Sequence, residues 1–178
     1  MRAKAFLILF GLAAFAAGIW GFRFVNSAEV VAPAAPRATA LAAMAFPDVT
    51  GRQRQFSEWS GKILIVNFWA TWCPPCKEEM PEFDRLQTEY GPKGVQFVGV
   101  ALDDADAVGA YLQHSPVGYP ILIGEAGGTE WAEKLGNTFQ VLPFTVVFDR
   151  SGTVVQAKAG PYTRGELVAL FERLAARN

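Results

Sequence analysis

Two cysteines, Cys73 and Cys76, stand three positions apart in Trp72-Cys-Pro-Pro-Cys76, and the 178-residue chain contains no others. Two thiols at this spacing at a helix start can close a disulfide with little backbone movement, so they can exchange disulfides with another protein. A purely structural disulfide is a poor explanation for the pair, because closing so short a loop stabilises the fold by only about 2 kcal/mol on the chain-entropy model. The spacing therefore predicts a redox-active dithiol.

The two thiols are expected to have different roles. Cys73 comes before the helix, where free N–H groups and the positive end of the helix dipole lower the pKa of a thiol. Cys76 lies one turn further in and is shielded by the helix. We therefore predict that Cys73 attacks a substrate disulfide to form a mixed disulfide, and that Cys76 resolves it.

Other uses of a cysteine pair need residues that the sequence lacks. A four-cysteine zinc site needs a second pair, and a haem-attachment motif needs a histidine where Lys77 stands. Copper(I) held by the two thiolates stays open, because soft ligands select it. We interpret His114, the single histidine, as a surface residue at a helix end. Asp103, Asp104 and Asp106 are predicted to be helix-capping residues. Apart from that copper(I) alternative, we expect no resident metal and no cofactor.

Strands and helices alternate around the cysteine motif. Nearly continuous apolar runs over 62–70 and 95–102 predict strands buried on both faces, and 75–90 has helical spacing between them. The remaining expected elements are a hairpin over 46–56 turning at Thr50-Gly51, strands at 119–123, 145–148 and 153–159, helices at 104–113 and 129–135, and a final helix opened by Thr163 and Glu166. This order predicts an α/β fold with a mixed central sheet, helices on both faces and an N-terminal β-hairpin extension.

The N-terminus reads as an export signal or a membrane anchor. Ala5 to Phe22 is an uncharged run of 18 residues behind Arg2 and Lys4. Its extension to residue 25 reaches the roughly 20 residues that cross a bilayer, so we expect an anchor over 1–25 with a cytoplasmic N-terminus. Cleavage after Ser27 stays open, because this residue suits a signal-peptidase site.

The rest of the chain divides into a linker and one domain. Residues 26–45 are rich in alanine and proline and have little to bury, which predicts a linker. Residues 46–178 carry 12 basic and 16 acidic side chains, which leaves a net charge of −4. Because duplex affinity comes largely from clustered Lys and Arg, we expect no nucleic-acid partner.

The segment Val66-Asn-Phe-Trp-Ala-Thr-Trp-Cys-Pro-Pro-Cys-Lys-Glu-Glu-Met-Pro81 resembles the membrane-anchored TlpA/ResA-like thioredoxins, and the resemblance runs from about Phe46 to the C-terminus. It implies a thioredoxin-like fold over 46–178 and a cis Pro143 packed against the cysteines. Leu142 would then offer its backbone to an extended substrate. The expected substrate contacts are Trp72, Pro74, Pro75 and Leu142.

Two positions depart from thioredoxin itself. Thioredoxin keeps a buried acid in the strand before its motif, where this chain has Asn67. Glu79 matches an acidic residue near the thiols of ResA-like proteins. A partly buried Glu79 would have a raised pKa and could exchange a proton with Cys76. The alternative is a solvated helix glutamate like Glu78, and core packing is likewise the alternative to a site role for Trp69.

The resemblance also implies a physiological role. It points to a reductase of exported protein disulfides, single-pass in the inner membrane with its catalytic domain in the periplasm or another extracytoplasmic space. A transmembrane electron donor of the DsbD or CcdA type would re-reduce it, with apocytochrome c or copper-site assembly proteins as candidate substrates. A disulfide oxidant and a copper(I) metallochaperone remain alternatives, since both would use the same two cysteines.

Overall fold

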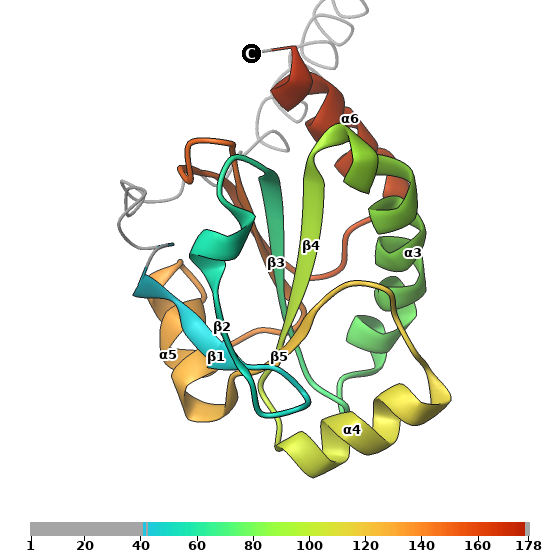
Figure 1. Ribbon diagram of the computed structural model, residues 1–178, viewed down its shortest axis with the longest axis vertical. Coiled ribbons are helices and arrows are strands. Elements are labelled where there is room, and N and C mark those ends of the chain that lie inside the picture. Colours follow the sequence, from blue (N-terminus) through green and yellow to red (C-terminus); the bar gives the residue numbers. More distant parts are fainter. Residues whose placement is uncertain (1–40, 42, 177–178) are drawn as a thin grey trace, which may run out of the picture. The chain divides into compact units, whose positions relative to one another are not determined.

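The computed structural model describes residue 41 and residues 43–176, which form the domain in Figure 1. The anchor expected over 1–25 and most of the linker expected over 26–45 lie outside the described residues. No helix within the described part is long and apolar enough to cross a membrane.

A mixed five-stranded sheet forms the centre of the domain (Figure 1), with the strand order β5-β4-β3-β6-β7. The central strand β3 (Ile63–Trp69) pairs in parallel with β4 (Val95–Ala101) and antiparallel with β6 (Phe144–Phe148). The edges are β5 (Ile121–Ile123), parallel to β4, and β7 (Val154–Ala159), antiparallel to β6. Every residue of β3 and β4 is buried, as their continuous apolar runs predict.

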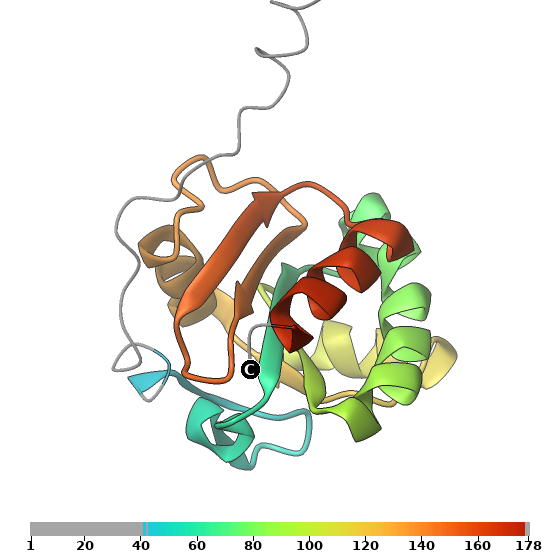
Figure 2. The same ribbon diagram turned by 90° about the horizontal axis from the view of Figure 1, so that it is seen from above.

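Three helices cover one face of the sheet (Figure 2): α3 (Pro74–Tyr90), α4 (Ala105–His114) and α6 (Arg164–Ala175). A short 3-10 turn, η2 (Gly91–Lys93), follows α3. The expected capping box opens α6, with Thr163 accepting from the Glu166 amide. The α6 side chains that pack on the sheet are the expected ones: Leu167, Leu170, Phe171 and Leu174.

The opposite face is covered by α5 (Glu125–Lys134) and by the N-terminal extension. The extension is a hairpin of β1 (Ala45–Pro47) and β2 (Gln53–Gln55), followed by the 3-10 turn η1 (Phe56–Trp59). The Phe56 ring packs edge-on against Trp59 with 5.4 Å between ring centroids, and both side chains are buried. The expected α/β fold with helices on both faces and an N-terminal hairpin is therefore confirmed.

One helix begins earlier than the sequence indicates, at Glu125 rather than at Thr129. Gly127 and Gly128 weaken the helical signal of its first turn in the sequence, because glycine is a poor helix former. Gly128 instead allows close packing: a Cβ there would lie 2.6 Å from Leu102 Cδ2 and 3.2 Å from Val100 Cγ1. The glycine lets α5 approach β4 more closely than a side chain would permit.

The packed core begins before Phe46. Met44 is fully buried, Leu41 is buried beside it, and both belong to the cluster beneath α5. The Met44 carbonyl accepts a 3.1 Å hydrogen bond from the Phe56 amide, which ties this segment to the end of β2. The last residues of the segment expected as a linker therefore contribute to the core.

Candidate active site

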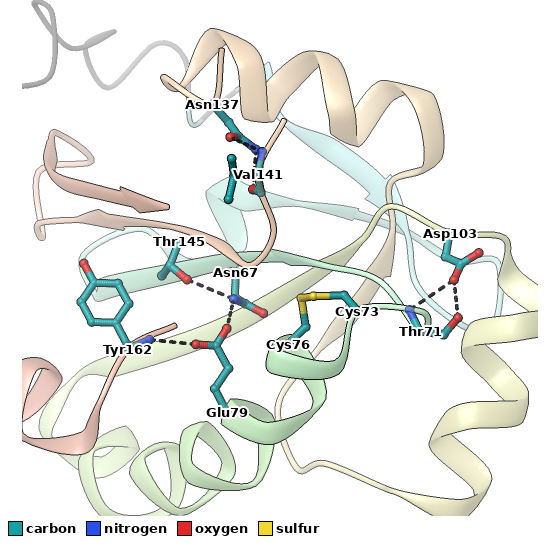
Figure 3. The surroundings of a disulfide bond; sticks show 10 residues. All are labelled: Asn67, Thr71, Cys73, Cys76, Glu79, Asp103, Asn137, Val141, Thr145 and Tyr162. Atoms are coloured by element: carbon teal, nitrogen blue, oxygen red, sulfur yellow. Dashed lines mark hydrogen bonds between the residues drawn. A yellow bond between two sulfur atoms is a disulfide. The ribbon is translucent and has the colours of Figure 1, made fainter. Parts of the chain in front are cut away.

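The two cysteines lie where β3 ends and α3 begins, and they are joined in a disulfide (Figure 3). Cys73 is the N-cap of α3 and has an extended backbone, while Cys76 lies inside the first turn. Cys73 is 4% exposed and Cys76 is fully buried. Cys73, the less buried of the two residues, is therefore the one at the positive end of the helix dipole, which favours a thiolate.

The residues that flank Cys73 present an apolar surface beside the disulfide. Trp72 is 67% exposed, which is unusual for a large aromatic side chain. Pro74 is exposed and Pro75 half-buried in the first helical turn, where a missing N–H costs nothing. Trp69, in contrast, is fully buried and packs against Tyr111 with 5.4 Å between ring centroids, so it is a core residue.

The peptide bond between Leu142 and Pro143 is cis, as the resemblance implies. The buried Pro143 accepts a 2.8 Å hydrogen bond from the Gly160 amide, which fixes the entry into β6. Leu142 is half-buried and lies beside Trp72 in a shared groove. No hydrogen bond to another described backbone group occupies the amide or the carbonyl of Leu142.

Glu79 is only 5% exposed, so the alternative of a solvated helix glutamate is wrong. Its Oε1 accepts a 2.8 Å hydrogen bond from Asn67 Nδ2, and its Oε2 accepts a 3.0 Å bond from the Tyr162 amide (Figure 3). Asn67 Nδ2 also donates to Thr145 Oγ1 at 3.0 Å. Because Glu79 follows Cys76 by three residues, both side chains lie on one side of α3.

Burial raises the pKa of Glu79 from its ordinary 4.5 to about 7. The Tyr162 amide, the Asn67 side chain and the charge of Lys158 act in the opposite direction, and burial outweighs them. A carboxyl group with this pKa can both take and give a proton near neutral pH. This property fits a partner for the resolving thiol.

A groove next to Trp72 lies between α5 and the loop before Pro143. Its lining includes Trp72, Leu102, Thr129, Ala132, Gln140 and Leu142. Two hydrogen bonds within the loop stabilise its conformation. Asn137 Oδ1 accepts from the Val141 amide at 2.9 Å, and Asn137 Nδ2 donates to the Val141 carbonyl at 3.0 Å. Phe139, at the tip, is 89% exposed.

The prediction that Asp103 caps a helix is wrong, because the N-cap of α4 is Asp104, and the loop before Pro143 was not predicted as part of the site. The Asp103 carboxylate accepts hydrogen bonds from the amide and the hydroxyl of Thr71, two residues before Cys73. It thereby ties the active-site turn to the end of β4. Its position in the sequence was the available signal. Asp103 follows the end of β4 and Thr71 follows the end of β3, and the carboxyl ends of neighbouring parallel strands lie at the same edge of a sheet.

Asp104 and His114 lie at the two ends of α4, as the sequence predicts. Asp104 is the N-cap of α4 and accepts from the Ala107 amide at 2.8 Å. His114 Nδ1 lies 2.9 Å from the Ala110 carbonyl at the end of the same helix. Among the described residues, no three histidine, cysteine or acidic side chains gather into a possible metal site.

Comparison with known proteins gives one consistent picture. A sequence model of the Redoxin family matches residues 31–171. A thiol-disulfide oxidoreductase ResA from Bacillus cereus is 30% identical over 130 residues, which cover 71% of this chain and 72% of that protein. The ResA of Oceanobacillus iheyensis is 32% identical over 122 residues, which cover 68% of this chain and 62% of that protein.

Solved structures agree. A thiol:disulfide interchange protein of the thioredoxin family from Chlorobium tepidum TLS superposes with a TM-score of 0.67 at 26% identity, covering 74% of this chain and 92% of that one. The MTB dsbF structure, in mixed oxidized and reduced forms, superposes with a TM-score of 0.65 at 27% identity, covering 76% and 97%. The thioredoxin-like fold that the cysteine motif indicates is confirmed.

Proposed function

The chain belongs to the Redoxin family and is a thiol-disulfide oxidoreductase of the ResA type, and from this premise we propose that it reduces disulfides in exported proteins. The observation that carries the proposal is the burial of Glu79 one helical turn from Cys76. A resolving thiol must lose its proton during substrate reduction and regain it when the dithiol is restored. A buried carboxyl with a pKa of about 7 can serve both steps.

The cycle begins with the reduced pair. The Cys73 thiolate attacks one sulfur of the substrate disulfide, that S–S bond breaks, and its electron pair leaves on the other substrate sulfur, which takes a proton. Cys76 then gives its proton to the Glu79 carboxylate and attacks Cys73 Sγ. The mixed disulfide breaks, and the second substrate sulfur leaves as a thiolate that is protonated in turn. The substrate gains two electrons and two protons, and the enzyme keeps the Cys73–Cys76 disulfide.

The surface around Cys73 is suited to an extended protein segment. Trp72, Pro74 and Leu142 provide apolar contacts beside the disulfide, and the Leu142 backbone is free to pair with a strand of the substrate. The exposed Phe139 extends the apolar surface along the loop before Pro143. A disulfide in an unfolded or extended region would fit this site better than one buried in a folded domain.

The location and the partners form the finer part of the proposal. The apolar run over 5–22 supports an anchored protein whose domain faces the periplasm or another extracytoplasmic space. We propose a transmembrane electron donor of the DsbD or CcdA type, with apocytochrome c or copper-site assembly proteins as candidate substrates. Fractionation of cells that express the full chain tests the location. The protein should sediment with membranes and keep residues 1–27, whereas a periplasmic species that begins at Ala28 would indicate cleavage.

The decisive measurement is the reduction potential of the Cys73–Cys76 pair in a defined thiol buffer. A reductase should lie near the roughly −270 mV of thioredoxin, and an oxidant near the roughly −120 mV of DsbA. Trapping of free thiols in living cells complements it. We expect the pair to be mostly reduced when the electron donor is present and to become oxidised when the donor is deleted. A pair that stays oxidised with the donor present would favour the oxidant instead.

A further inference from the structure

Among the described residues, five buried side-chain polar atoms have no hydrogen-bond partner, and the only amide or carboxyl oxygen among them is Asn67 Oδ1, next to Glu79. The other four are Trp69 Nε1, Tyr119 Oη, Arg150 Nε and Tyr162 Oη. Asn67 Oδ1 is buried and accepts no hydrogen bond from any residue that the structure describes. The amide nitrogen of the same side chain is fully used, with bonds to Glu79 at 2.8 Å and to Thr145 at 3.0 Å. Buried acceptors in proteins nearly always have a partner, so an orphan beside a reactive pair calls for a functional explanation.

The orphan oxygen faces the cysteines. Along β3, Asn67 lies between Ile65 and Trp69, and both of these pack in the same buried cluster as Cys73 and Cys76. Figure 3 shows the Asn67 amide with its nitrogen turned to Glu79 and Thr145 and its oxygen turned toward the disulfide. Cys76 lies on α3 one turn before Glu79, the residue that the nitrogen binds.

We propose that Asn67 Oδ1 accepts a hydrogen bond from the Cys76 thiol once the disulfide is reduced. A disulfide sulfur carries no hydrogen and can donate nothing, whereas a thiol has one S–H group. The oxygen is therefore without a partner only in the oxidised protein. Asn67 would be a positioning residue whose amide bridges Cys76 and Glu79, the two groups between which the proton moves. This inference builds on the proposed function but concerns the redox states of the protein itself.

The bond would form during re-reduction by a dithiol donor. A donor thiolate attacks Cys73 Sγ, the Cys73–Cys76 bond breaks, and its electron pair leaves on Cys76 Sγ. That sulfur takes the proton of the neutral Glu79 carboxyl, and the new S–H turns to Asn67 Oδ1. The second donor thiolate then releases Cys73, and the donor keeps a disulfide. In substrate reduction the same proton returns to Glu79, and the Asn67 oxygen loses its partner again.

The first test observes the S–H group directly by infrared spectroscopy. The chain has two cysteines, so Cys73→Ser leaves a single S–H oscillator, that of Cys76. We expect its stretching band to lie at the lower frequency of a hydrogen-bonded thiol. Adding Asn67→Leu should shift the band upward to the frequency of a free thiol, whereas Asn67→Asp, which keeps an acceptor oxygen, should leave it low. Adding Thr145→Val is the matched control and should not move the band, because it removes only the other partner of the amide nitrogen.

The second test is the equilibrium between the oxidised and reduced pair. A hydrogen bond present only in the reduced state stabilises the dithiol, so its loss in Asn67→Leu should make the protein harder to reduce. We expect the equilibrium constant with a reference dithiol to fall about tenfold, which corresponds to about 30 mV toward more negative potential. Thr145→Val should stay within a few millivolts of the parent.

A third measurement needs no substitution at Asn67 and covers the case in which Asn67→Leu fails to fold. In the parent protein with isotope-labelled asparagine, the infrared difference between reduced and oxidised states should contain an asparagine carbonyl band that moves to lower frequency on reduction. The proposal would be overturned if the carbonyl band kept its frequency on reduction, or if Asn67→Leu folded and left the S–H frequency unchanged. None of these readouts uses a substrate, so a failure of the proposed reductase function would leave them unchanged.

Discussion

Asn67 of β3 donates a 2.8 Å hydrogen bond to Glu79 of α3, so the two residues that distinguish this site from thioredoxin are direct partners. Glu79 is held on its other oxygen by the Tyr162 amide, and Asn67 on its nitrogen by Thr145 of β6. Segments far apart in the chain thus fix one carboxyl group behind the resolving thiol. The site keeps a buried acid, and that acid comes from the helix rather than from the strand.

Substitution of each cysteine should have a different consequence. Cys73→Ser should abolish disulfide reduction, because the nucleophile at the helix N-terminus is lost. Cys76→Ser should leave Cys73 able to attack but unable to release the substrate, so a mixed disulfide should accumulate and be visible on a non-reducing gel. If Cys76→Ala turned over substrate at the parent rate, Cys76 could not be the resolving thiol.

Replacing Glu79 by glutamine should alter the titration of the thiols. A buried carboxyl near two thiols couples to them, and we expect a change of at least about one pK unit, or roughly 1.4 kcal/mol. The pH dependence of the exchange rate should change with it, while far-UV circular dichroism stays that of the parent. Glu78→Gln is the matched control, since Glu78 is exposed on the same helix. Equal and small effects of the two substitutions would mean that the proton reaches Cys76 by another route.

The burial of Glu79 should also make stability depend on pH. Its pKa is raised to about 7 in the folded protein from an ordinary 4.5, so the folded state holds the proton more tightly. The stabilisation is fully present below pH 4.5 and is lost as the pH rises through 7, which lowers the unfolding free energy by about 3 kcal/mol in all. Urea unfolding at several pH values measures this slope. Glu79→Gln should flatten it and Glu78→Gln should not; parallel profiles for the parent and Glu79→Gln would contradict the assignment.

The apolar surface beside Cys73 should matter for protein substrates and not for small ones. Trp72→Ala removes an exposed ring beside Cys73, and Phe139→Ala removes one on the loop before Pro143. Burial of such a ring on binding contributes about 1.5–3 kcal/mol. We expect KM for a protein disulfide to rise about tenfold or more, with little change for a small aromatic disulfide. Val49→Ala, at an exposed apolar residue of the hairpin turn, is the control. An equal loss with both substrate types would point to damaged chemistry instead of lost docking.

Much of the fold and part of the site could be predicted from the sequence because their signals are local. The continuous apolar runs of β3 and β4 indicated buried strands, and Thr163 with Glu166 indicated the start of α6. The spacing of Cys73 and Cys76 determined the chemistry, since a helix start brings two such thiols within bonding distance whatever surrounds them. The start of α5 was misplaced, because two glycines weaken the helix signal there.

Tertiary structure alone decided how the site is tuned. Whether Glu79 is solvated or buried depends on the elements packed around it, and its two hydrogen-bond donors lie 12 and 83 residues away in the chain. The same holds for Asp103, which reaches Thr71 across 32 residues, and for the orphan oxygen of Asn67. A pKa and a hydrogen bond depend on desolvation and on distance in space, and sequence spacing specifies neither beyond about one helical turn.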